Sequence, residues 1–204
     1  MATRSQIVEK AYKCLDEVYP DTPLSSDIDE FHIEDFVDDA IRFIGRVAPV
    51  RALGGETLSL TKNSIASNYK MSHLTGDIVR LVSLKMSDWD LPVTEFLYTD
   101  HPRYKQQSNP VLKGSVKRPV VFITNSGDLE IYSSNGSVEE ALGFVVDKGL
   151  TIVGGGTTQY NVDYPDQLSE AIAWKTAELV LSAMNDVQGI QFAQAQLKQL
   201  LEAL

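Results

Sequence analysis

Two amphipathic helices are predicted in the first fifty residues, because apolar side chains recur there at intervals of three and four. The first helix runs from about Thr3 to Val18, with Thr3 as its expected N-cap. Pro20 and Pro23 then break the chain. The second helix spans about Ile33 to Arg46, although it could open as early as Ser26 or Asp29. Its apolar stripe consists of Ile33, Phe36, Val37, Ala40, Ile41 and Ile44.

The pattern changes to strands from Asp77 onward. Ile78 to Leu84 is typical of a largely buried strand, and Val93 to Tyr98 follows as another. Pro119 to Thr124 and Leu129 to Ser133 flank a polar loop that contains Gly127, which is a hairpin signal. Gly143 to Val146 adds one more short strand. We therefore expect a small antiparallel unit between about 77 and 150. Residues 55–75 are ambiguous and could form a loop followed by a short helix around Lys62 to Met71.

The last third returns to helical spacing. Gly154 to Gly156 predict a flexible hinge, and Pro165 suits the first turn of a helix, where its missing N–H costs nothing. The helix from about Pro165 to Val187 is apolar over a wide arc, which favours a position between other elements. Gly189 is expected to separate it from a final helix, Ile190 to Leu204.

These elements predict an α+β fold that is mostly a helical bundle with an inserted small antiparallel β region. Three segments follow from it: N-terminal helices of the bundle (1–54), a β-rich insertion (55–153) and a hinge with the C-terminal helices (154–204). The chain has 204 residues, of which 43% are hydrophobic and 23% charged. A chain of this size and composition can bury a core without metals or disulfides.

The net charge of the chain limits the kinds of partner that it can bind. The formal net charge is −10 and the sequence pI is about 4.7, which works against tight binding to DNA because such binding depends on Lys and Arg releasing counterions. An acidic surface would instead let DNA pass without sticking. The start of the sequence has no apolar segment of a secretory signal, and no stretch approaches the roughly 18 apolar residues that span a bilayer. We therefore expect folding in a cytoplasm and no membrane partner.

Candidate chemistry is sparse, and we expect neither catalysis nor a cofactor or metal. His32, His73 and His101 lie far apart in the sequence without the spacing of a zinc site, and structural or surface roles suit them. The Gly154 run lacks the lysine of a phosphate loop. Cys14 lies on the apolar stripe of the first helix, so it fits a small buried hydrophobe better than a nucleophile.

The predicted second helix and the residues before it are acidic. Between Asp21 and Gly45 there are eight acids and one base. Paired carboxylates such as Asp35 and Asp39, four residues apart, could in principle serve hydrolysis, but a solvated face or an interface rim is the more ordinary interpretation. Within that interpretation, Asp35, Asp38 and Asp39 would line a negative channel. The cluster comprises Asp27, Asp29, Glu30, Glu34, Asp35, Asp38 and Asp39.

A basic arm spans residues 101–118, with five bases and no acid. Loops of this length in compact domains are usually functional. A basic arm on an acidic chain suits head-to-tail association between copies, although a plain solvated loop is the alternative. The arm's candidate partner-binding residues are Arg103, Tyr104, Lys105, Lys117 and Arg118.

The terminal helix is the second candidate contact surface. Its apolar stripe is bordered by amides, and only Lys198 and Glu202 are charged from Ile190 onward. Uncharged amides lose less on desolvation than ionised groups, which suits a helix that docks into a partner. The alternative is a helix that closes its own domain's core. Its candidate partner-binding residues are Gln191, Phe192, Gln194 and Lys198.

Five segments together resemble the head-to-tail adaptor proteins of tailed bacteriophages, and among them the portal-proximal ring proteins of crAss-like phages. The resemblance rests on element order and segment character over nearly the whole chain, with no catalytic motif to check. The segments are DFVDDAIRFIGRVAP (35–49), DIVRLVSLKMSDW (77–89), DHPRYKQQSNPVLKGSVKRPVVFI (100–123), LEIYSS (129–134) and PDQLSEAIAWKTAELVLSAM (165–184).

The resemblance implies a virion protein of the neck, made in the host cytoplasm. Such adaptors form a ring of twelve copies, bind the portal through C-terminal elements, contact further neck or tail rings and extend the channel for DNA. On this chain, the Gly154–Gly156 hinge and the helices after it would reach the portal, and the arm at 101–118 would contact a neighbouring subunit or ring. The alternatives are another neck or tail-completion (stopper) component and a small cell-wall hydrolase that uses the acidic cluster.

Overall fold

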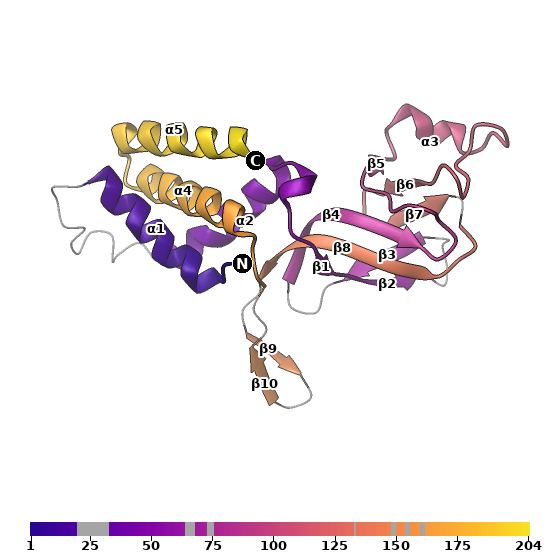
Figure 1. Cartoon of the computed structure of the whole chain (residues 1–204), viewed down its shortest axis with the longest axis horizontal. Helices are drawn as coiled ribbons and strands as arrows, with labels where there is room; N and C mark the ends of the chain where they lie inside the picture. The colour runs from indigo at the N-terminus through magenta and orange to yellow at the C-terminus, as the bar shows by residue number, and fades with distance from the viewer. Residues whose placement is uncertain are drawn as a thin grey trace. The chain divides into compact units, whose positions relative to one another are not determined.

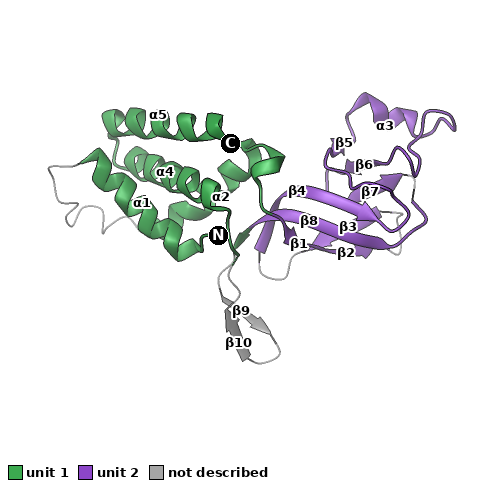
Figure 2. Ribbon diagram, viewed as in Figure 1, with its two compact units in different colours: residues 1–54, 146–204 green, residues 55–145 purple. Residues whose placement is uncertain are grey.

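The computed structural model describes residues 1–19, 33–63, 68–72, 76–132, 134–147, 150–153, 156–159 and 162–204 (Figure 1). The chain divides into two compact units (Figure 2). The first, called here the helical unit, joins Met1–Gly54 to Val146–Leu204, and the second, the β unit, is Gly55–Val145. The two ends of the sequence therefore fold together, and the β unit is an insertion between them.

The helical unit is built around α4 (Asp166–Ala183), which packs against α1 (Arg4–Val18), α2 (Ile33–Val47) and α5 (Val187–Ala203) (Figure 1). The short η1 (Val50–Ala52) follows α2. Because neighbours surround α4, side chains on several of its faces are buried, as the wide apolar arc predicted. The helices expected at Thr3–Val18 and Ile33–Arg46 are also confirmed.

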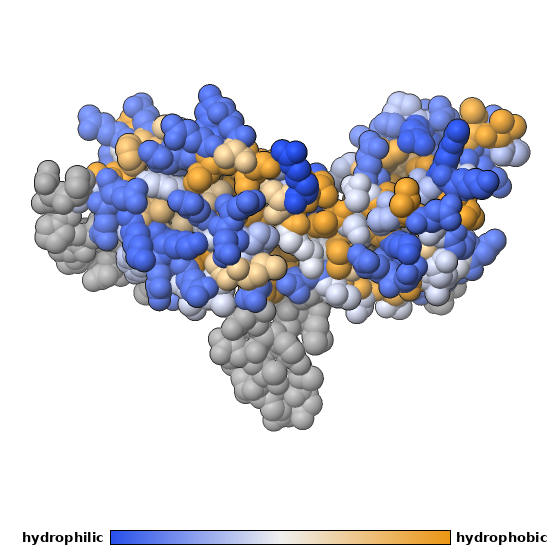
Figure 3. Space-filling model, in the orientation of Figure 1, coloured by the Kyte–Doolittle hydropathy of each residue, from blue (hydrophilic) through white to orange (hydrophobic). Residues whose placement is uncertain are grey.

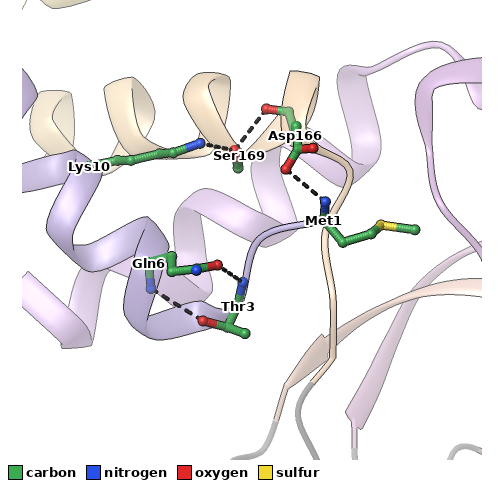
Figure 4. Close-up of polar contacts among 6 residues, drawn as sticks. All are labelled: Met1, Thr3, Gln6, Lys10, Asp166 and Ser169. Carbon is green, nitrogen blue, oxygen red and sulfur yellow. Dashed lines mark hydrogen bonds and ion pairs between the residues drawn. The ribbon is translucent and has the colours of Figure 1, made fainter.

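Polar contacts join the first turn of α4 to Met1 and to Lys10 of α1 (Figure 4). Thr3 caps α1 and forms a reciprocal capping box with Gln6. The backbone of Ala2 pairs with that of Tyr164, with an N–H···O distance of 2.7 Å. Lys10 Nζ donates to Ser169 Oγ at 2.5 Å, which joins the middle of α1 to α4.

The turn between α4 and α5 is made by Asn185, not by Gly189 as the sequence suggested. Asn185 has a φ of 58°, a left-handed conformation that asparagine tolerates better than most residues. Asp186 then caps α5 by accepting a hydrogen bond from Gln188 N at 3.1 Å. Gly189 lies inside the first turn of α5, where an added Cβ would clash with the Asp186 carboxylate and lie 3.0 Å from Leu181. It is a close-packing glycine.

The β unit contains two sheets. One has three strands in the order β1 (Glu56–Thr57), β8 (Val138–Asp147) and β4 (Gly76–Met86). The other has five, in the order β2 (Ser59–Lys62), β3 (Asn68–Ser72), β7 (Leu129–Tyr132), β6 (Val120–Ile123) and β5 (Leu97–Tyr98). β6 and β7 form the predicted hairpin. A further antiparallel pair joins β9 (Leu150–Val153) to β10 (Gly156–Gln159).

The expected helical bundle with a small antiparallel insertion is wrong. The described structure is 43% helical and 28% strand, with two sheets besides the β9–β10 pair, and the five-stranded sheet is mixed because β5 runs parallel to β6. A short helix was one possibility around Lys62 to Met71, but the described ends of this segment belong to the antiparallel strands β2 and β3, with Leu60 opposite Met71. β3 also pairs with β7, so contacts distant in sequence decide its conformation.

Two other expectations are corrected or remain open. The strand expected over Val93 to Tyr98 is reduced to Leu97–Tyr98, and Val93 forms only an isolated bridge with Leu84. Of the predicted hinge, Gly154 and Gly155 lie outside the described residues, and Gly156 begins β10.

Candidate functional site

The outer helix α5 buries few of its apolar side chains within its own unit. Ala193 and Leu197 are buried, together with Gly189, whereas Ile190, Leu200, Leu201 and Leu204 are only half-buried. Figure 3 shows apolar side chains between polar ones over the edge of the unit where α5 lies. The half-buried leucines leave apolar surface that a second polypeptide can cover.

A groove of about 370 Å³ follows α5 where it meets α2 and α4. Its apolar lining comes from Phe43 on α2 and from Leu197 and Leu201 on α5. Three elements therefore build the groove, and no single stretch of sequence contains it. Its polar lining consists of Lys175, Glu178, Gln194, Lys198 and Glu202.

Two of the four charged groups in the groove, Lys175 and Glu178, form a close ion pair. Lys175 Nζ lies 2.7 Å from Glu178 Oε2, with only 12% and 13% of the two side chains exposed. The Lys175 ammonium also lies 4.3 Å from the centre of the Phe43 ring, a cation–π contact. Gln194 Nε2 donates to Glu178 Oε1 at 3.0 Å. A partner that covers the part of the groove around Glu178 would meet polar groups that are already hydrogen-bonded, which lowers the desolvation cost there.

The predicted α5 contact residues separate into two kinds. Gln194 and Lys198 line the groove, whereas Gln191 and Phe192 do not. The Phe192 ring packs edge-on against Trp174 of α4, with centroids 5.7 Å apart, yet Phe192 remains 41% exposed. Gln191 is exposed. Lys198 lies 3.9 Å from Glu202 across one turn, and solvent screens this pair because 78% and 69% of the side chains are exposed.

The basic arm connects β5 to β6, and this explains its length. Parallel neighbours cannot be joined by a tight turn and need a crossover of a dozen or more residues. The arm begins with the five-residue α3 (Pro102–Gln106), which is capped by His101 through Arg103 N at 3.2 Å. The long loop is therefore a structural requirement of the mixed sheet, whereas its charge is not.

The arm is held in shape by two anchors. The buried Gln107 side chain donates to Arg103 O and accepts from Gly114 N, both at 2.9 Å, and so bridges the arm. The Tyr104 ring packs edge-on against Phe122 and Tyr132, with centroid distances of 5.1 and 6.4 Å. Tyr104 thus contacts its own sheet, although sequence reasoning placed it in a partner-binding set.

The outer surface of the arm is basic and apolar together. Arg103, Lys105, Lys117 and Arg118 are exposed, as is Lys113. Val111 is 88% exposed and Leu112 is 58% exposed, and apolar side chains are visible at this end of the β unit in Figure 3. Covering valine and leucine side chains as exposed as these would be favourable, because it removes apolar surface from water.

The acidic candidates are only partly described, because Asp27, Asp29 and Glu30 lie outside the described residues. Asp35 and Asp39 are exposed on α2. Asp38 is half-buried beside Arg4, with Nη2 to Oδ1 at 3.2 Å, and burial raises its pKa above the usual range despite the neighbouring guanidinium. Asp38 therefore links α2 to α1 through its ion pair with Arg4, and it is not a free surface charge.

The other residues considered for chemistry have structural roles or lie outside the described part of the chain. Cys14 is buried, and burial raises the pKa of its thiol to about 12. His32 and His73 lie outside the described residues, and His101 caps α3. Among the described residues, no three histidine, cysteine, aspartate or glutamate side chains converge on a possible metal position. None of the described helices is long and apolar enough to cross a membrane.

Sequence reasoning missed three groove residues, namely Phe43, Lys175 and Glu178. A signal was present for two of them, because Lys175 and Glu178 form a charged i, i+3 pair within the most apolar part of this helix. No local signal identifies Phe43, which belongs to α2 and meets Lys175 only through the packing of α2 on α4.

Comparison with known proteins adds no assignment, since the sequence matches no protein-family model and no curated protein. The functional inference therefore rests on the groove, the arm and their chemistry.

Proposed function

We propose that this chain is a structural protein of a phage virion, a head-to-tail adaptor that forms a ring, binds the portal and extends the DNA channel. The observation that carries the proposal is the surface of α5, where half-buried leucines border a groove whose two least exposed charged groups, Lys175 and Glu178, are already paired. This combination is suited to a surface that binds another polypeptide.

The pairing in the groove favours a permanent contact. An interface that buries an unpaired charge loses several kcal/mol. In the groove, Glu178 already binds Lys175 and Gln194 before any partner arrives. The groove's apolar side chains, Phe43 and Leu201 among them, can then contribute contact area without that cost.

The charge distribution suits a channel component. The helical unit contains eighteen acids and nine bases, a net charge of −9, whereas the β unit has ten acids and nine bases, a net charge of −1. In the proposed ring, the exposed carboxylates of Asp35 and Asp39 face the lumen and repel DNA phosphates, so that the genome passes without binding.

Co-purification with the portal protein of the same phage tests the proposal. We expect the wild-type chain to bind the portal and Leu201→Asp to lose most of the binding, because the new carboxylate would be buried at the contact. Val187→Asp is the matched control, since Val187 is 64% exposed in the first turn of the same helix and does not line the groove. Thermal melts establish that both variants fold.

Two results would count against the proposal. If the wild-type chain does not bind the portal, the adaptor function is wrong. If Leu201→Asp binds as well as wild type, α5 is not the portal contact, and a position elsewhere in the neck or tail gains support. Asp35→Ala and Asp39→Ala should leave portal binding unchanged.

A further inference from the structure

The arm presents a surface that its own sheet does not explain. Its connection to β6 accounts for its length, and Gln107 and Tyr104 account for its shape. Neither accounts for five bases without an acid, or for Val111 at 88% exposure beside Leu112 at 58%. A rigid protrusion with apolar side chains among bases is suited to insertion against an acidic surface that has an apolar centre.

Such a surface exists on α1. Glu9, Tyr12 and Asp16 are exposed at positions i, i+3 and i+7, which lie along one face of a helix. Tyr12 is 39% exposed, and its ring lies between the two acids along that face. The exposed charged residues of this part of α1 are Glu9, Lys13, Asp16 and Glu17, with a net charge of −2. The stripe is therefore acidic around an aromatic ring, whereas the arm has bases around aliphatic side chains.

We infer that the arm of one copy binds the α1 stripe of the next copy, with Lys113 and Lys117 facing Glu9 and Asp16 and with Val111 and Leu112 against Tyr12. This inference rests on the proposed ring and names the contact that closes it. The two surfaces are different, so the contact is heterologous and repeats from copy to copy until a ring closes. The net charge of −9 on the helical unit favours the same pairing at longer range.

Charge reversal with mixing tests the contact. The arm variant is Lys113→Glu with Lys117→Glu, and the stripe variant is Glu9→Lys with Asp16→Lys. Each variant alone opposes like charges at every contact, so we expect its self-association to weaken at least about tenfold. In a mixture, each reversed arm meets a reversed stripe and each native arm meets a native stripe. Mixing should therefore restore assembly.

The control reverses two bases of the same unit that lie outside the arm. Lys62 on β2 and Lys70 on β3 are both exposed, and Lys62→Glu with Lys70→Glu changes the net charge as much as the arm variant does. Sedimentation velocity over a wide concentration range, at low and high salt, is the measurement. The control should associate like wild type, and wild-type association should weaken with added salt.

The possible outcomes separate this contact from the adaptor function. Restoration by mixing supports the contact. Wild-type rings that persist in both variants overturn the contact and leave the ring intact. A wild-type chain that stays monomeric throughout overturns both the contact and the ring. Loss of binding to phosphatidylserine vesicles in the arm variant, with unchanged self-association, would assign the arm to a membrane surface and also overturn the contact.

Discussion

The side-chain amide of Gln194 donates a hydrogen bond to Glu178, 3.0 Å away, and so ties α5 to α4. Glu178 at the same time holds Lys175 at 2.7 Å. One carboxylate therefore organises the groove, and its removal should affect stability as well as partner binding.

Glu178→Ala should lower the free energy of unfolding by about 1–3 kcal/mol, because it leaves the ammonium of Lys175, a side chain only 12% exposed, without its anion. The matched variant is Glu202→Ala, which removes the acid of a solvent-exposed pair on α5. It should produce no measurable change. Chemical denaturation compares them, and equal losses in the two variants would contradict the structural role of Glu178.

Gln107→Ala should loosen the basic arm. The buried amide of Gln107 bonds Arg103 O and Gly114 N, and its loss leaves both groups without that partner. We expect trypsin to cleave the native protein faster between residues 103 and 118, at the arm's own lysines and arginines. Gln106→Ala, at an exposed neighbouring position, is the control. Unchanged cleavage in Gln107→Ala would show that the arm keeps its shape without this side chain.

Asp186 makes the stability of the protein depend on pH in the acidic range. The Tyr19 hydroxyl donates to its carboxylate, and this bond, together with the Gly189 and Gln188 amides, holds the pKa of Asp186 below its usual range. A lowered folded-state pKa stabilises the protein above the unfolded pKa of about 4, and this stabilisation is lost as the pH falls through the folded-state value.

Asp186→Asn should therefore keep most of the capping at pH 7 but flatten the acid limb of the stability profile. Asp186→Ala should cost about 1 kcal/mol at neutral pH through loss of the cap. Urea unfolding measured from neutral to acidic pH follows both effects. If Asp186→Asn loses stability at low pH as the wild type does, the carboxylate of Asp186 is not the cause of the pH dependence.

Cys14 should be unreactive in the folded protein. Burial, reinforced by the charges of Glu17 and Glu170, raises the pKa of its thiol to about 12, so the thiolate is scarce at neutral and mildly alkaline pH. We expect a thiol reagent such as DTNB to label it only after denaturant is added. Rapid labelling of the native chain would contradict the burial of Cys14 on the inner face of α1.

Local signals predicted the helices well. Thr3 and Gln6 stand at the spacing of a capping box, so the start of α1 could be identified from a few residues. The apolar stripe of α2 and the loop around Gly127 between β6 and β7 are equally local. The prediction failed at the turn between α4 and α5. Gly189 was the stronger turn signal in the sequence, but Asn185 makes the turn.

Contacts between distant segments explain what the sequence could not predict. Residues around Tyr69 form β3 because β2 and β7 pair on either side of it, and the parallel pairing of Leu97 with Phe122 cannot be inferred from either strand alone. The groove has the same origin. Gln194 and Lys198 were predicted as contact residues, but the meeting of Phe43, Lys175 and Glu178 requires α2 and α4 to pack beneath α5.

The most direct test of the adaptor account is cryo-electron microscopy of the chain purified together with the portal of the same phage. The account predicts a closed ring seated on the portal through α5, and the resemblance to head-to-tail adaptors implies twelve copies. A chain that remains monomeric and does not associate with the portal would contradict it.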